Sequence, residues 1–191
     1  MPRSPREDHE GAWHHVMNRG IARAAVFRSA SDRSIFLEWL AAAAERYGLQ
    51  VHAYCLLDNH FHLLLLSERG LLSDGVRFLT ARFTQRINYR DGRDGPIFRG
   101  RFRSIMIESD AHLVRVSRYI HRNPIEAALA RSPEDWAWSS AAAYLGISEK
   151  PKWLETGAIL EMFGAARARN EYKAFLEAEV DEATRKRYQD W

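Results

Sequence analysis

Cysteine is almost absent from this chain of 191 residues, because Cys55 is the only one and lies in an apolar run. A disulfide framework needs paired cysteines, and a cysteine-based zinc site needs several thiolates. The sequence therefore excludes both. Disulfide-free chains are typical of reducing compartments, so we expect a cytoplasmic protein.

Long hydrophobic runs are also missing. No apolar stretch approaches the roughly 20 residues that a membrane-spanning helix requires. Residues 1–10 are polar and contain Pro2 and Pro5, unlike a secretory signal peptide. We therefore expect no membrane partner.

Lysine is scarce, so most of the 28 basic residues are arginines. The formal net charge is only +3. The planar guanidinium group nevertheless matches phosphate oxygens better than the lysine ammonium does. The composition is thus compatible with an anionic partner, without demonstrating one.

The apolar residues follow the periods of an α+β protein. Hydrophobic residues make up 46% of the chain, which is enough to build a core. The pattern predicts four strands, at 13–18, 51–57, 61–67 and 103–107. It also predicts three helices: the first begins at a cap formed by Ser31 or Asp32 and ends at Gly48, the second spans 72–89, and the third begins at a cap formed by Asp110 and ends at Pro124. This order is the split β-α-β, or ferredoxin-like, arrangement, for which we expect a four- to five-stranded antiparallel sheet with helices on one face.

The character of the chain changes after residue 132. Aromatic residues punctuate loops, and residues 156–182 have a helical pattern. We therefore predict a main domain over 1–132, which carries the candidate site residues described below, and a helical C-terminal appendage over 133–191.

His60 and His62 form the first candidate site. Side chains two apart on a strand point to the same face, so both imidazoles can reach one metal ion. A pair of partly exposed histidines at the start of a strand is the alternative for this motif taken alone.

Tyr119 and Asn123 form the second candidate site. At 3.6 residues per turn they lie about 40° apart on a helix, whereas His121 lies on nearly the opposite side. Asn123 is therefore the candidate third ligand, although the following proline disfavours helical angles there. For Tyr119, the alternative is a boundary aromatic with its hydroxyl in water.

Five segments in this order resemble the HUH single-tyrosine nucleases, and specifically the REP-associated tyrosine transposases. They are residues 14–20 (HHVMNRG), 59–65 (NHFHLLL), 100–104 (GRFRS), 119–124 (YIHRNP) and 135–140 (DWAWSS). The resemblance spans about residues 13–180. It implies the HUH nuclease fold, a metal bound by His60, His62 and Asn123, and Tyr119 as the nucleophile.

The resemblance also implies a function. We expect a transposase that cuts single-stranded DNA near hairpin-forming palindromic repeats, through a 5′-phosphotyrosine, and that can rejoin the strands. Two imidazoles and an amide oxygen suit Mg²⁺ or Mn²⁺, although spacing alone does not exclude zinc. Both a monomer and a homodimer fit the sequence.

Arginines next to aromatic rings indicate where DNA binds. In residues 98–103, Arg99, Arg101 and Arg103 alternate with Phe98 and Phe102, a pairing that holds phosphates and stacks bases. We also expect contacts from Arg19, Arg82 and Arg86. The alternative is a solvated basic face.

Two other functions fit parts of this pattern. A split β-α-β sheet can be a non-catalytic nucleic-acid-binding module, but that module places Phe or Tyr where this chain has His60 and His62. A replication initiator or plasmid relaxase uses the same metal pair, usually in a larger chain.

Overall fold

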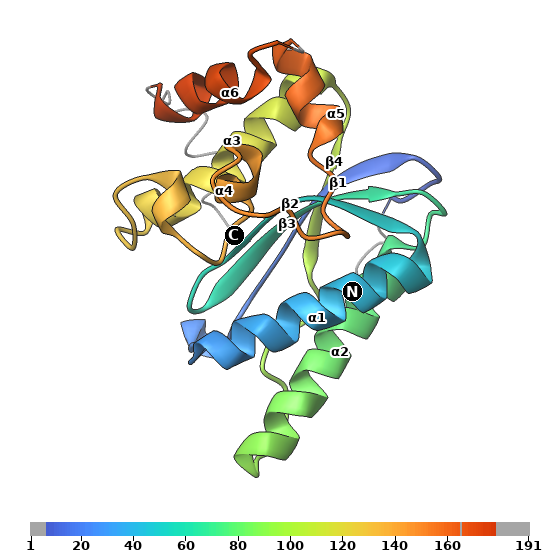
Figure 1. The fold of residues 1–191 in the computed structure, drawn as a ribbon. Coiled ribbons are helices and arrows are strands. Elements are labelled where there is room, and N and C mark those ends of the chain that lie inside the picture. The colour runs from blue at the N-terminus through green and yellow to red at the C-terminus, as the bar shows by residue number, and fades with distance from the viewer. Residues whose placement is uncertain (1–6, 165, 179–191) are drawn as a thin grey trace.

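The computed structural model describes residues 7–164 and 166–178 (Figure 1). The strands are β1 (Ala12–Arg19), β2 (Leu49–Leu56), β3 (His60–Ser67) and β4 (Arg103–Ile107). The α-helices are α1 (Ala30–Tyr47), α2 (Leu72–Asp91), α3 (Asp110–Glu126), α4 (Ala141–Tyr144), α5 (Gly157–Leu160) and α6 (Ala168–Glu177). The 3₁₀ turns are η1 (Ile21–Arg23), η2 (Pro133–Asp135) and η3 (Glu161–Phe163).

The four strands form one sheet in the order β2-β3-β1-β4, and all pairs are antiparallel. In the register of β1 and β3, Arg19 lies opposite His60 and Met17 lies opposite His62. Arg103 of β4 pairs with Met17 from the other side. The predicted ferredoxin-like class is therefore confirmed, with four strands.

Helices cover both faces of the sheet, so the prediction of helices on one face is wrong. Leu63 and Leu65 of β3 belong to a core shared with α1 and α2, whereas Leu64 belongs to a second core shared with α3. Figure 1 shows α1 and α2 on one side of the sheet and α3 to α6 on the other. The cause is visible in the sequence, since an uninterrupted run of leucines suits a strand that is buried on both faces.

The ends of two helices differ from the sequence prediction. α1 begins earlier, because Ser29 caps it in a reciprocal pair with Asp32. α3 does not stop at Pro124 but continues to Glu126. A proline in the last turn removes one hydrogen bond without ending the helix, so Asn123 keeps a helical position one turn after Tyr119.

Residues after 132 pack against the sheet. The backbone N–H of Leu56 in β2 donates to Trp138 (2.9 Å), and the N–H of Ser140 donates to Tyr54 (3.0 Å). Tyr172 and Leu176 of α6 share the second core with α3. Residues on both sides of the predicted boundary thus share one core.

The predicted helical stretch 156–182 is interrupted. α5 and η3 end at Gly164, whose positive φ of 83° breaks the helix before α6 begins. The part beyond residue 178 lies outside the described residues. None of the helices within the described ranges is long and apolar enough to cross a membrane.

Acid should weaken the junction between α3 and the C-terminal region. His121 is fully buried, with Nδ1 2.7 Å from Tyr172 Oη and Nε2 2.7 Å from Ser140 Oγ. Burial lowers the pKa of His121 to about 3. Because this is below the unfolded value near 6.5, the unfolded chain binds the proton first. Stability is therefore lost as the pH falls from about 6.5 towards 3.

We expect the protonation of His121 in the unfolded chain to lower the free energy of unfolding by about 2 to 3 kcal/mol between pH 6.5 and pH 4.5. Urea denaturation at both pH values checks this, with His121→Gln as the comparison. The variant should lose less stability on acidification than the wild type. An equal loss in both proteins would contradict the assignment.

Candidate active site

The four predicted catalytic and metal-binding residues lie together, on β3 and α3 of the same chain. The ring centroids of His60 and His62 are 5.1 Å apart, and the Tyr119 ring lies 5.3 Å from the His62 ring. Asn123 Oδ1 is 3.3 Å from His60 Nε2. The structure thus brings these side chains together, while their roles stay predictions.

Local structure explains this convergence. His60 and His62 alternate with Phe61, which points into the opposite core, so both imidazoles face α3. On α3, Val116 and Ile120 are fully buried, whereas Tyr119 is only partly buried. An open pocket of about 250 Å³ lies beside them, and its walls are Arg19, Arg23, Asn59, His60, Tyr119, Asn123, Glu126 and Ala127.

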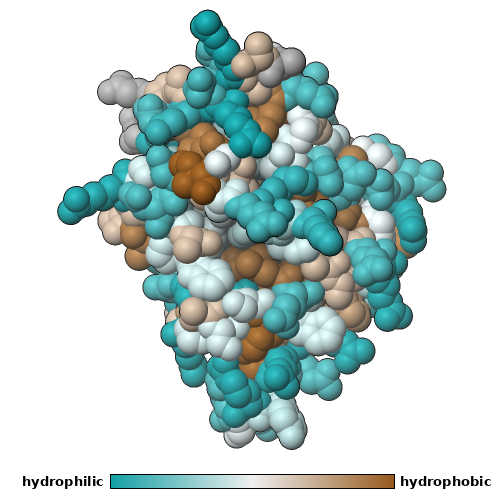
Figure 2. All heavy atoms as spheres, viewed as in Figure 1, coloured by the Kyte–Doolittle hydropathy of each residue, from teal (hydrophilic) through white to brown (hydrophobic). Residues whose placement is uncertain are grey.

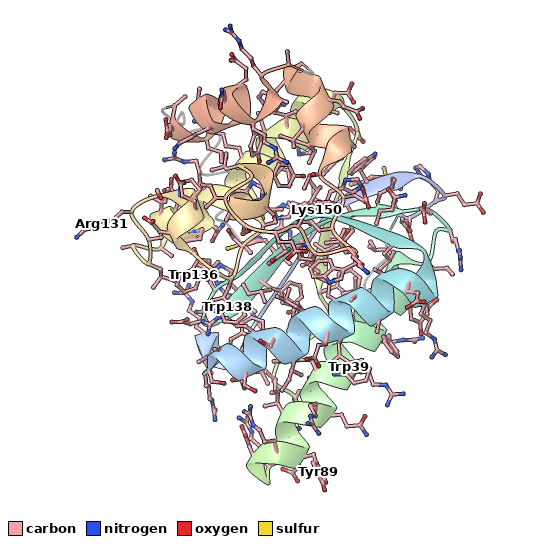
Figure 3. The ribbon with its side chains drawn as sticks, in the orientation of Figure 1. Trp39, Tyr89, Arg131, Trp136, Trp138 and Lys150 are labelled. Carbon is pink, nitrogen blue, oxygen red and sulfur yellow. The ribbon has the colours of Figure 1, made fainter. Side chains whose placement is uncertain are left out.

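A buried arginine holds the turn that presents His60. Arg33 of α1 forms an ion pair with Asp58, which lies in the β2–β3 turn. The guanidinium carbon of Arg33 also lies 5.6 Å from the Trp136 ring and 5.8 Å from the Trp138 ring. Figure 3 shows the two tryptophans side by side near the start of α1. The motif at 135–140 therefore supports the turn before His60 and contacts β2 directly.

The histidines of the site are neutral at physiological pH. Burial lowers the pKa of His60 to about 4, despite the opposing contact with Asn123. Burial, with smaller contributions from His60 and His15, holds the pKa of His62 well below its usual value. Neutral imidazoles keep one ring nitrogen unprotonated, which is the form that binds a metal.

The contact between His60 and Asn123 fits a cation. His60 Nδ1 donates to Asn59 Oδ1 at 2.6 Å, so the neutral ring has its lone pair on Nε2. That nitrogen faces Asn123 Oδ1, another acceptor. Two acceptors 3.3 Å apart repel each other unless a positive charge or a proton lies between them, or the Asn123 amide turns its NH₂ group towards the imidazole.

The donor set is two imidazoles and one amide oxygen. Among residues 7–164 and 166–178, no cluster of three or more His, Cys, Asp or Glu side chains could hold a metal. A cation at this position would therefore depend on Asn123, with water or substrate oxygens as further ligands. Such a set fits Mg²⁺ or Mn²⁺.

Sequence reasoning missed His15 of β1. Its Nε2 lies 3.0 Å from His62 Nδ1, and its ring lies 5.8 Å from the Tyr119 ring. Burial, together with nearby His112 and Arg103, lowers the pKa of His15 to about 3. Only the register of β1 against β3 reveals this contact, because the two histidines are 47 residues apart.

Four of the six predicted DNA-binding arginines lie together. Arg19, Arg99, Arg101 and Arg103 line one pocket of about 240 Å³ with Met17, Asn18 and Gly100. The N–H of Arg99 donates to the carbonyl of Arg19 (2.8 Å), which joins the 97–101 loop to the end of β1. Because Arg19 also lines the Tyr119 pocket, the two pockets adjoin.

The other two arginines lie on α2. The guanidinium carbon of Arg82 is 5.8 Å from the Trp39 ring and 5.5 Å from the Phe78 ring, on the sheet face opposite the histidines. Arg86 is exposed on the same helix. Figure 2, in which α1 and α2 occupy the lower half as in Figure 1, shows mainly hydrophilic side chains and scattered apolar patches there. The structure therefore does not join Arg82 and Arg86 to the pocket of the other four.

Comparison with known proteins defines the class of this chain. The family model described as "Transposase IS200 like" matches residues 9–123. Since this is more than half of the chain, the protein belongs to the IS200-like transposase family.

The similar proteins agree with the more specific resemblance. One is a Haemophilus influenzae protein provisionally named a REP-associated tyrosine transposase, 27% identical over 107 residues. That match covers 50% of this chain and 61% of the relative. A solved structure titled as a REP-associated tyrosine transposase bound to a REP hairpin has the same fold, with a TM-score of 0.65 at 16% identity. It covers 81% of this chain and 92% of the other. The predicted resemblance to REP-associated tyrosine transposases is thereby confirmed.

Proposed function

We propose that this protein is a metal-dependent single-stranded DNA endonuclease and strand transferase that acts beside hairpin-forming repeats. The observation that carries the proposal is the convergence of one phenol, two neutral imidazoles and one amide oxygen, of which Tyr119, His60 and Asn123 line one pocket and His62 lies buried beside them. Transposases are a DNA-cleaving class of enzyme, and a relative with the same fold is titled as bound to a REP hairpin.

Tyr119 supplies the nucleophile. Its phenol oxygen attacks the scissile phosphorus, the bond from phosphorus to the 3′ oxygen breaks, and that oxygen leaves as a protonated hydroxyl while the phenol proton passes to solvent. The product is a 5′-phosphotyrosine, whose ester bond allows a 3′-hydroxyl to rejoin the strand without a nucleotide cofactor. A phenol with an ordinary pKa near 10 is a weak nucleophile at neutral pH, so the site must assist it.

His60, His62 and Asn123 would hold Mg²⁺ or Mn²⁺ at this site. The cation, when bound, polarises the phosphoryl group and neutralises charge that builds up during attack. The neutral histidines favour such binding because they do not repel a cation. Arg19 borders both pockets and is suited to bind the phosphate next to the cut.

A covalent trapping experiment tests the proposal. The purified chain is incubated with Mn²⁺ and a hairpin oligonucleotide that has a single-stranded extension, labelled at either end. We expect a protein–DNA adduct that survives detergent and contains only the DNA on the 3′ side of the cut. Hairpin binding without any adduct would instead favour a non-catalytic binding module.

The arginine pocket should account for much of the salt dependence of DNA binding. Replacing Arg99 and Arg101 by glutamine should weaken hairpin binding about 10- to 100-fold and reduce the slope of log affinity against log salt by about 1.4, since each lost phosphate contact removes about 0.7. Fluorescence anisotropy at several salt concentrations measures both quantities.

The matched comparison is Arg82→Gln with Arg86→Gln, which removes the same charge from α2. Because these arginines lie away from the pocket, we expect a smaller change in slope. A larger effect from the α2 pair would mean that DNA follows the other face of the sheet.

A further inference from the structure

We propose that Asn59 and His15 are positioning residues that fix the tautomers of the two neutral imidazoles of the metal site, so that both carry their proton on Nδ1 and present Nε2 to the same cation. This inference rests on the proposed metal-dependent function. Neither residue is expected to touch the cation. Each acts through a hydrogen bond to the far nitrogen, Nδ1, of the histidine that does.

The Asn59 contact has only one workable arrangement. The Asn59 Nδ2 donates to the carbonyl of Arg23 (3.2 Å), so the amide oxygen faces His60. That oxygen accepts from His60 Nδ1 at 2.6 Å, and a carbonyl oxygen cannot donate. The proton of neutral His60 is therefore on Nδ1, and the lone pair on Nε2 points towards Asn123.

The contact with His15 places the proton of His62 on Nδ1 in the same way, from the buried side of that ring. His15 Nε2 lies 3.0 Å from His62 Nδ1, and both side chains are fully buried. A cation cannot bind at His62 Nδ1, because His15 occupies that position. His62 can therefore bind a cation only through Nε2, which requires the Nδ1 proton to be donated to His15.

The opposite arrangement would disable the site. If His15 donated its Nε2 proton, His62 would accept at Nδ1 and hold its own proton on Nε2, where no metal could bind. Histidine ligands usually donate their second nitrogen to a fixed acceptor, and loss of that acceptor typically weakens metal binding 10- to 100-fold. Two such acceptors, one per histidine, prepare both nitrogens before the cation arrives.

Imidazole nitrogen NMR and Mn²⁺ calorimetry on the full chain test this inference together. In the cation-free wild type at pH 7.5, we expect His60 and His62 to be protonated at Nδ1. In Asn59→Ala and His15→Leu, the corresponding histidine should become a mixture of both tautomers, and Mn²⁺ should bind 10- to 100-fold more weakly. His15→Gln, which keeps an acceptor oxygen, should recover part of the affinity.

The control is His14→Leu. His14 is also fully buried on β1, but it contacts Asp8 and Ser104 away from the site. His14→Leu should therefore bind Mn²⁺ as tightly as the wild type. Weaker binding in this variant would show that the loss of any buried imidazole, and not the contact with His62, lowers the affinity of His15→Leu. Asn59 is only partly buried, so its variant tests the same idea should His15→Leu fail to fold.

The outcomes separate the two proposals. A wild-type chain that binds no Mn²⁺ overturns the proposed metal-dependent function. The cation-free spectra still show, independently of that result, which ring nitrogen of His60 and of His62 carries the proton. Protonation of His62 at Nε2 in the wild type would overturn the positioning role. Unchanged Mn²⁺ affinity in both Asn59→Ala and His15→Leu would do the same.

Discussion

Tyr119→Phe is expected to abolish the covalent protein–DNA adduct while hairpin binding stays within about twofold of wild type. The substitution removes one oxygen atom from a partly buried ring and keeps its packing against His62 and His15. Because that oxygen is the proposed nucleophile, its removal should lower adduct formation at least about 1000-fold. Gel detection of the adduct and anisotropy measure the two effects.

The matched control is Tyr89→Phe. Tyr89 is 83% exposed and projects into solvent near the end of α2 (Figure 3), a helix on the sheet face opposite α3. This variant should form the adduct at the wild-type rate. If Tyr119→Phe still formed the adduct, another residue would be the nucleophile. If it also lost hairpin binding, Tyr119 would contribute to DNA recognition as well.

Local patterns in the sequence were enough to predict the fold class. The alternation of strands and helices gave the split β-α-β order, and four strands were found in the expected order along the chain. The faces covered by helices were not predicted correctly. The split β-α-β order predicts helices on one face of the sheet, whereas Leu63 to Leu65 of β3 are buried on both faces by α1, α2 and α3.

The pairing of His60 with His62, and of Tyr119 with Asn123, followed from two short-range rules. Residues two apart on a strand, and four apart on a helix, share a face. Neither rule says where α3 lies over the sheet. That placement depends on long-range packing and on the contacts of His121 with Tyr172 and Ser140, which single motifs do not show.

The positions of His15 and of the arginines could not be read from the sequence for the same reason. His15 reaches His62 only because β1 pairs with β3 in one register. Arg82 was predicted to contact DNA together with Arg99 and Arg101, but α2 places it over Trp39 on the opposite face of the sheet. Charge patterns along one helix do not reveal which side of the sheet that helix covers.

Metal removal and His60→Ala should have equal effects on cleavage. His60 is only partly buried, at the start of β3, so its truncation should leave the fold intact, unlike truncation of the fully buried His62. We expect adduct formation to fall about 10²- to 10⁴-fold, which corresponds to several kcal/mol of transition-state stabilisation. EDTA treatment of the wild type should give a similar loss, measured by the same gel assay.

Restoring the cation distinguishes a ligand from a residue that merely supports the pocket. Mn²⁺ added back should return the EDTA-treated wild type to full activity. His60→Ala should recover only at much higher Mn²⁺ concentrations, because one of the three proposed protein ligands is missing. His9→Ala, at an exposed position outside the site, should behave as wild type throughout. Recovery of His60→Ala at the wild-type Mn²⁺ concentration would show that His60 does not bind the cation. The facing acceptors His60 Nε2 and Asn123 Oδ1 would then need another source of positive charge, such as Arg19, which lines the same pocket.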